Sequence, residues 1–160
     1  MDTYRLIDIT LDESTVVRWS ADVDHERRVA IFDLVEENSF EVIRATEAGY
    51  HGPYRLKLAI QEGRLLFDLK TDSHQDIVCF RLAMSPFRRI IREYLSICDR
   101  YYEAIKSASP SQIEAIDMGR RGLHNDGSQL LRDRLEDKIK LDQQTARRLF
   151  TLICVLHMKG

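Results

Sequence analysis

A chain of 160 residues with 44% apolar and 31% charged residues has room for one domain with a substantial core, and this balance excludes an intrinsically disordered chain. The formal net charge of −2 conceals an asymmetry: residues 1–80 carry 9 Lys/Arg and 16 Asp/Glu (−7), whereas residues 81–160 carry 15 and 10 (+5). The basic half is either a set of solvated helix faces or a surface that attracts an anionic partner.

The first third of the chain contains one predicted strand and one predicted helix. Residues 4–11 alternate between apolar and polar side chains and predict a strand. An aspartate at position 22 or 24 is placed to cap a helix that begins near His25 and stops at Asn38. Residues 39–53 hold two glycines and a proline and predict a loop. In the irregular stretch before the helix, the apolar side chains expected to reach the core are Val16, Val17 and Trp19.

Residues 54–83 give the clearest β pattern. Three alternating runs are separated by short turns at 61–63 and 71–74. Strands joined so closely are antiparallel neighbours, so we expect a three-stranded meander with one dry face. Its two outer edges leave room for a homodimer. The charged side chains available to protect those edges are Lys57, Arg64 and Lys70.

The second half of the chain is helical. Ser85-Pro86 begins a long amphipathic helix of about five turns, with Ser85 as the cap and Pro86 in the first helical position. Ser109-Pro110 begins a short helix that runs through Ile116. Ser128 starts another helix, whose apolar side chains are Leu131, Leu135 and Ile139.

The last predicted helix is the most apolar one. Asp142 is placed to cap it, and residues 146–157 are apolar on nearly all sides, which predicts a central buried helix. The predicted fold class is α+β: a small antiparallel sheet of three to four strands, with the meander at 54–83, packs against a helical second half. We expect a single domain over 1–160, made of an acidic α+β half (1–84) and a basic helical half (85–160).

The sequence also predicts a cytoplasmic protein without membrane contact. Cys79, Cys98 and Cys154 are odd in number and lie among apolar neighbours, as buried thiols in a reducing compartment do. The N-terminal residues carry no basic stretch followed by an apolar core, so we expect no signal peptide. No segment reaches the roughly 20 apolar residues that span a bilayer.

The main candidate for function is the glycine-rich run at 117–128. Gly127 and Ser128 lie where a new helix is expected to begin, and the free N–H groups of a helix start attract anions. Arg120 and Arg121 can each donate two hydrogen bonds to a phosphate or carboxylate. We predict an anion or partner site, whose candidate residues are Gly119, Arg120, Arg121, Gly122, His124, Asn125, Gly127 and Ser128.

A purely structural explanation of the same run stays open. A helix–loop–helix corner needs a left-handed residue, which Gly122 or Gly127 can supply, and a cap, which Asp126 or Ser128 can supply. The spacing matches neither the phosphate loop nor the dinucleotide-binding fingerprint.

Three functions follow from these residues. The favoured one is a non-catalytic binding or adaptor protein that holds an anionic small molecule or an acidic protein surface, because no complete acid–base or nucleophile set can be assembled. The alternative is an enzyme acting on a phosphorylated small molecule. In that enzyme Arg120 and Arg121 clamp the phosphate, and His124 with Asp117 or Asp126 transfers protons. It requires His124 within hydrogen-bond reach of a carboxylate.

The third function is RNA association, and nucleic acid is the least favoured partner. Tyr101 and Tyr102 adjoin a basic helix face and could stack on bases, although Tyr101 is also needed for the apolar stripe. The arginines of that face are Arg88, Arg89, Arg92 and Arg100. The histidines stand apart at 25, 51, 74, 124 and 157, so we expect no metal site, and no cofactor is indicated.

Several long motifs together resemble a known family. They are HERRVAIFDLVEENSF at 25–40, GPYRL at 52–56, IEAIDMGRRGLHN at 113–125 and TARRLFTLI at 145–153. The chain is similar to uncharacterised protein family 0262, small cytoplasmic proteins of alphaproteobacteria. The resemblance covers nearly the whole chain. It implies a bacterial cytoplasmic setting, and it carries over no activity, cofactor or catalytic residue.

Overall fold

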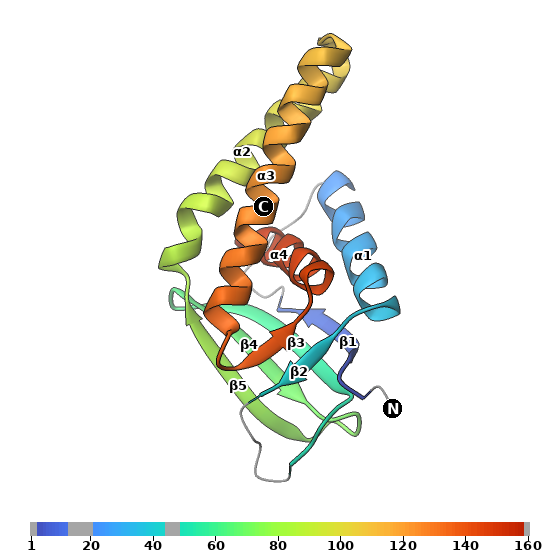
Figure 1. Cartoon of the computed structure of the whole chain (residues 1–160), viewed down its shortest axis with the longest axis vertical. Helices are drawn as coiled ribbons and strands as arrows, with labels where there is room; N and C mark the ends of the chain where they lie inside the picture. Colours follow the sequence, from blue (N-terminus) through green and yellow to red (C-terminus); the bar gives the residue numbers. More distant parts are fainter. Residues whose placement is uncertain (1–2, 13–20, 44–48, 159–160) are drawn as a thin grey trace.

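The computed structural model describes residues 3–12, 21–43 and 49–158 (Figure 1). Val16, Val17 and Trp19 lie outside these ranges. The elements in chain order are β1 (Leu6–Leu11), α1 (Ala21–Glu36), β2 (Phe40–Val42), β3 (Tyr54–Gln61), β4 (Arg64–Lys70), β5 (Asp76–Ala83), α2 (Ser85–Ser107), α3 (Pro110–Leu135), β6 (Ile139–Leu141) and α4 (Gln143–His157).

The predicted meander is confirmed as β3, β4 and β5. Leu58 on β3 pairs with Phe67 on β4, and Phe67 pairs in turn with Phe80 on β5. All three side chains are buried. Glu62 and Gly63 both have positive φ, at 52° and 71°, and they form the two-residue loop between β3 and β4. Such loops match the right-handed twist of the flanking strands.

The fourth strand of the sheet runs in a direction that the sequence did not reveal. β1 pairs with β3 in parallel, with Ile9 opposite Leu56, so the sheet is mixed and has the order β1-β3-β4-β5. The expected antiparallel pairing therefore holds for the meander alone. Parallel neighbours need a crossover connection, and α1 lies within the segment that joins β1 to β3.

A second, two-stranded sheet corrects two predictions. Residues 40–42, in the expected loop, form β2 and pair antiparallel with β6, with Phe40 opposite Leu141. Ile139 belongs to β6 rather than to the preceding helix, which ends at Leu135. Three-residue strands are too short to show a period, and long-range pairing is what stabilises them.

The helix α1 begins earlier than predicted and stops where expected. It starts at Ala21, so both candidate capping aspartates lie inside its first turn. Beyond its end, the Asn38 side-chain amide donates to the carbonyls of Leu34 (2.6 Å) and Leu6 (2.9 Å), and its oxygen accepts from the Leu6 N–H (2.7 Å). One side chain thus joins the end of α1 to β1.

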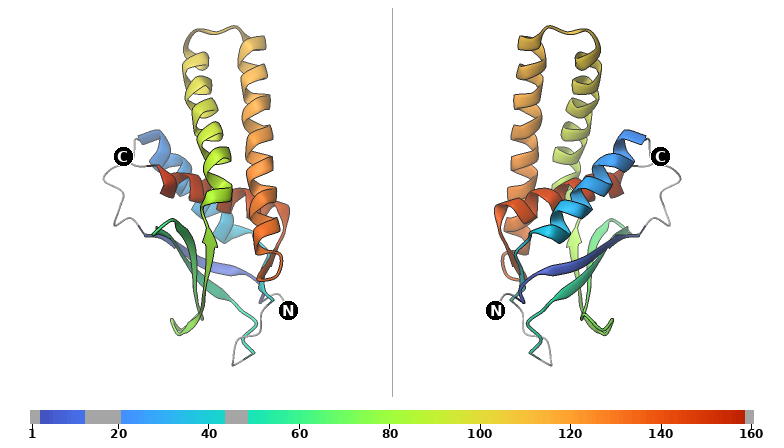
Figure 2. Two further views of the ribbon diagram at one scale, coloured as in Figure 1. Left: turned by 90° about the vertical axis from the view of Figure 1, so that its left-hand side faces the viewer. Right: turned by 90° about the vertical axis from the view of Figure 1, so that its right-hand side faces the viewer.

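Two long helices form a hairpin that projects from the rest of the molecule (Figure 2). The helix α2 begins at the predicted place, but Ser85 is its first helical residue and not its cap, which is Met84. Ser109 caps α3 with its side chain, and Gln112 completes the capping box.

The glycine-rich run does not form a corner. Gly119, Gly122 and Gly127 all lie within α3, which is continuous for 26 residues. The predicted break after Ile116 and the predicted helix start at Ser128 are therefore wrong. Ser128 is buried in mid-helix, where its hydroxyl donates to the His124 carbonyl at 2.7 Å. Each glycine in a helix costs about 1 kcal/mol relative to alanine. The tertiary packing of α3 outweighs this cost, and the helix stays continuous.

That packing is the contact between α3 and α4. The predicted central helix is confirmed: Asp142 caps α4 by accepting from the Thr145 N–H at 2.9 Å, and most of the helix is buried beneath α1 and α3. A β-carbon on Gly127 would overlap the ring of Phe150. Gly127 thus lets the two helices approach closely. No helix within the described residues is long and apolar enough to cross a membrane.

We predict opposite effects for two alanine substitutions in α3. Gly127→Ala should destabilise the protein by about 1–3 kcal/mol, because the added methyl group collides with Phe150. Gly122→Ala should stabilise it by about 0.5–1 kcal/mol, because nothing lies within 4 Å of a β-carbon there and alanine favours the helix. Chemical denaturation of both variants measures the difference, and equal effects would contradict the proposed role of Gly127.

Candidate functional site

A cleft of about 470 Å³ lies between α1, α3 and α4. A volume in this range suits a small molecule. The side chains that line it come mainly from three helices and carry charges of both signs. From α1 they are His25, Glu26, Val29, Ala30 and Asp33; from α2, Tyr94; from α3, Arg120, Arg121 and His124; and from α4, Gln144, Arg147, Arg148 and Thr151.

The structure brings three of the predicted site residues, Arg120, Arg121 and His124, to this cleft. The others are placed elsewhere on α3. Gly119, Gly122 and Asn125 are exposed without lining the cleft, while Gly127 and Ser128 are buried against the core. Because these residues lie within a helix, their backbone N–H groups are not free to converge on an anion.

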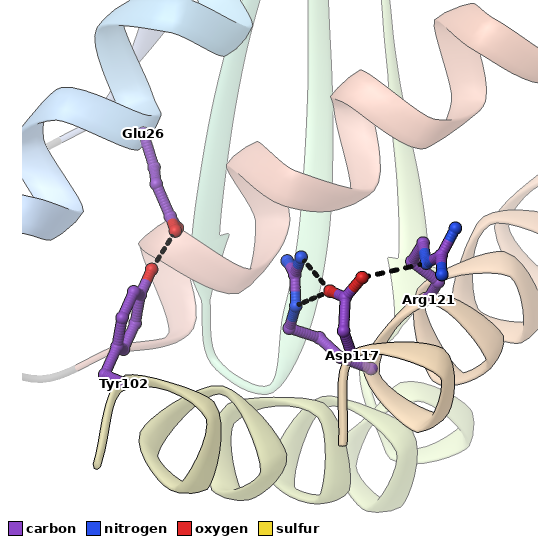
Figure 3. Close-up of polar contacts among 5 residues, drawn as sticks. Glu26, Tyr102, Asp117 and Arg121 are labelled. Atoms are coloured by element: carbon purple, nitrogen blue, oxygen red, sulfur yellow. Dashed lines mark hydrogen bonds and ion pairs between the residues drawn. The ribbon is translucent and has the colours of Figure 1, made fainter. Parts of the chain in front are cut away.

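The expected arginine clamp is already occupied by a carboxylate of the chain itself. Asp117 accepts from Arg120 at 2.6 Å through one oxygen and contacts Arg121 at 3.2 Å through the other (Figure 3). The Arg120 guanidinium also lies over the ring of Tyr101, 4.6 Å from its centroid. Asp117 therefore orders both arginines and is itself held by them, and the other proposed acid, Asp126, is exposed.

His124 is buried and bonded to a neutral partner. The Thr151 hydroxyl donates to the Arg147 carbonyl at 3.2 Å, so its oxygen accepts from His124 Nε2–H at 2.8 Å. Nδ1 is then the unprotonated nitrogen, and it has no hydrogen-bond partner among the described residues. Burial, with the nearby charges of Arg147 and Arg120, lowers the pKa of His124 from 6.5 to about 4. The imidazole is therefore neutral at pH 7.

Sequence reasoning missed the contribution of α4. Arg147 and Arg148 line the cleft, and within the described parts of the chain neither forms an ion pair with a carboxylate. Arg148 donates to the Glu37 carbonyl just beyond the end of α1 at 3.2 Å, where the helix dipole favours a cation. The signal was the Arg-Arg pair at 147–148 on a mainly apolar helix, but only the packing of α4 against α3 shows which surface it faces.

Arg147 of α4 contacts α3 one helical turn away from Arg121. Its Nη1 donates to the side-chain oxygen of Asn125, which stands four residues after Arg121 on α3. Both arginines line the cleft. The helices α3 and α4 thus each contribute a guanidinium group to the lining of the cleft.

The two tyrosines considered for base stacking are engaged within the protein. Tyr101 lies beneath Arg120, and the Tyr102 hydroxyl donates to Glu26 of α1 (Figure 3). Tyr102 therefore connects the hairpin to α1 beside the cleft.

Groups suited to a metal ion or a covalent step do not assemble in the part of the chain that the structure describes. No group of three His, Cys, Asp or Glu side chains is placed there to hold a metal ion. Cys98 and Cys154 are buried and Cys79 is half-buried, all as free thiols, and burial raises the pKa of each. Thiols of this kind are poor nucleophiles.

Comparison with known proteins identifies the family. The model of an uncharacterised protein family, UPF0262, matches residues 3–159. The chain belongs to this family. It is 53% identical to a UPF0262 protein of Erythrobacter litoralis over the full length of both chains. It is 57% identical to UPF0262 proteins of Brucella anthropi and Agrobacterium fabrum, over 98% of this chain and 95% and 97% of theirs. The resemblance inferred from the sequence motifs is thereby confirmed.

No solved structure matches this UPF0262 chain. Fold comparison therefore adds nothing about ligands, and the chemistry of the site has to be argued from its own side chains.

We predict that His124 makes the stability of this UPF0262 protein fall at mildly acidic pH. Its folded-state pKa is lowered, so the unfolded chain takes up the proton first, and stability is lost as the pH falls from 6.5 towards 4. Between pH 6.5 and pH 5 the free energy of unfolding should decrease by about 2 kcal/mol from this residue.

Urea denaturation across this pH range tests the prediction. His124→Asn should remove this pH dependence, whatever its absolute stability, while the exposed His74→Asn should retain it. Equal slopes for the wild type and His124→Asn would show that His124 does not titrate as described.

Proposed function

We propose that this protein is a non-catalytic binding protein of the cytoplasm and that the cleft between α1, α3 and α4 holds a small molecule with a phosphate or carboxylate group. The observation that carries the proposal is that Arg121 of α3 and Arg147 of α4 both line the cleft, and that Arg147 contacts α3 one helical turn from Arg121.

The two arginines have unused donors. Arg121 contacts Asp117 through Nε, and its two Nη atoms have no partner among the described residues. Arg147 gives one bond to a neutral amide oxygen and none to a carboxylate. A guanidinium group recognises the oxygens of phosphate and carboxylate through paired N–H donors, so two such groups favour an anionic ligand.

Binding is favoured over catalysis by the state of the remaining polar groups. A general acid or base works best with a pKa near the operating pH, whereas the pKa of His124 is lowered to about 4. Its hydrogen bond goes to Thr151 rather than to a carboxylate. Both carboxylate oxygens of Asp117 are already engaged by arginines of the chain.

Calorimetric titration with inorganic phosphate and ethyl phosphate, at fixed moderate ionic strength, tests the proposal. We expect saturable binding of one anion per chain. At a ligand concentration a hundred times the dissociation constant, the folded state should gain about 2.7 kcal/mol. Arg121→Gln and Arg147→Gln should each weaken binding about tenfold or more, because each removes charged hydrogen bonds.

The matched control is Arg134→Gln. Arg134 is an exposed arginine on the same helix as Arg121, and it does not line the cleft. The affinity of the Arg134→Gln variant for phosphate should equal that of the wild type. Absence of binding to the wild type, or equal losses in Arg134→Gln and Arg121→Gln, would contradict an anion site in the cleft.

A further inference from the structure

The cleft is divided by charge. Its four arginines come from α3 and α4, whereas its acidic side chains Glu26 and Asp33 both come from α1; the arginines are Arg120, Arg121, Arg147 and Arg148. In Figure 3, Glu26 on α1 lies apart from the Asp117–Arg121 pair on α3. A ligand in the cleft therefore meets a basic side and an acidic side.

These opposite charges have not neutralised each other across the cleft. Within the described residues, no ion pair joins Glu26 or Asp33 to Arg121, Arg147 or Arg148. Charges that served only to hold the helices together would be expected to pair directly, since unpaired charges gain nothing for the fold. The separation instead leaves donors on one side and acceptors on the other for something between them.

The carboxylates of Glu26 and Asp33 differ in whether they already accept a hydrogen bond. Glu26 already accepts the hydroxyl of Tyr102. The carboxylate of Asp33 is only partly exposed, and it has no hydrogen bond or ion pair in the described part of the chain. Asp33 stands seven residues after Glu26, and two helical turns keep both on the cleft side of α1. Asp33 is therefore the free acceptor of the acidic side.

We propose that the ligand is zwitterionic: its phosphate or carboxylate group binds Arg121 and Arg147, and a primary ammonium group on the same molecule binds Asp33. This inference rests on the anion site proposed above and specifies the class of ligand. A charged donor satisfies Asp33, the acid of the cleft that has no partner among the described residues, and the cavity volume of about 470 Å³ accommodates a short chain between the two charged groups.

The test compares probes that differ only in the ammonium group. Ethyl, propyl and pentyl phosphate are titrated calorimetrically at pH 7 beside the corresponding ω-aminoalkyl phosphates. In the wild type, at least one amino compound should bind about tenfold more tightly than its alkyl partner, as a charged hydrogen bond implies. The preferred chain length reports the spacing of the two subsites.

Asp33→Asn should abolish the preference for the ammonium group and leave the affinity for alkyl phosphates equal or higher, because it removes a negative charge from the cleft. The control is Glu36→Gln, an exposed acid of α1 that does not line the cleft, and it should keep the preference. Thermal unfolding confirms that both variants are folded.

Each outcome separates the two proposals. If alkyl phosphates bind and each amino compound binds only as well as its alkyl partner, the proposal of a zwitterionic ligand is wrong and the proposed anion site stands. The same conclusion holds if Asp33→Asn keeps the preference. If no phosphate of either series binds, both proposals are wrong.

Discussion

The close approach of α3 to α4 is the constraint on which the rest of the structure depends. Gly127 meets the ring of Phe150 where any side chain would collide, and this contact fixes how near the two helices lie. One turn earlier on α3, His124 bonds Thr151, which directly follows Phe150 on α4. Two further contacts of the same interface, Arg147 with Asn125 and Phe150 with His124, follow along it. The interface that stabilises the core therefore also forms one side of the cleft.

The remaining elements hold α4 in this position. Thr145 at its start accepts the Ser39 N–H at 2.9 Å, so the short sheet of β2 and β6 is anchored to the same helix. Arg148 joins α4 to the end of α1, and Asn38 joins that end to β1. The meander contributes the buried face beneath, with α4 packing on β3. Contacts distant in sequence thus converge on α4, which is why most of its residues are buried.

The sequence predicted correctly the features that depend on residues close together in the chain. Alternation and two short turns predicted the meander, Asp142 predicted the start of α4, and the family motifs predicted the relatives. It misled at Gly119, Gly122 and Gly127, where local propensity favours a break but packing against a neighbouring helix permits or requires glycine. It was wrong on β2, β6 and the direction of β1, because pairing between distant segments leaves no local period. The cleft itself follows from those tertiary contacts.

The arrangement of the arginines explains how one short run can serve both fold and binding. Neighbouring residues on a helix point about 100° apart, so the two members of an Arg-Arg pair face different surroundings. In the two pairs that line the cleft, one member is more engaged within the protein: Arg120 lies over Tyr101 and binds Asp117, and Arg148 donates to the Glu37 carbonyl at the end of α1. The side chains of the other members, Arg121 and Arg147, contact Asp117 and Asn125 and keep further donors for the proposed ligand. Because the helices that carry these arginines are held by such contacts, little ordering entropy would be lost if an anion binds there as proposed.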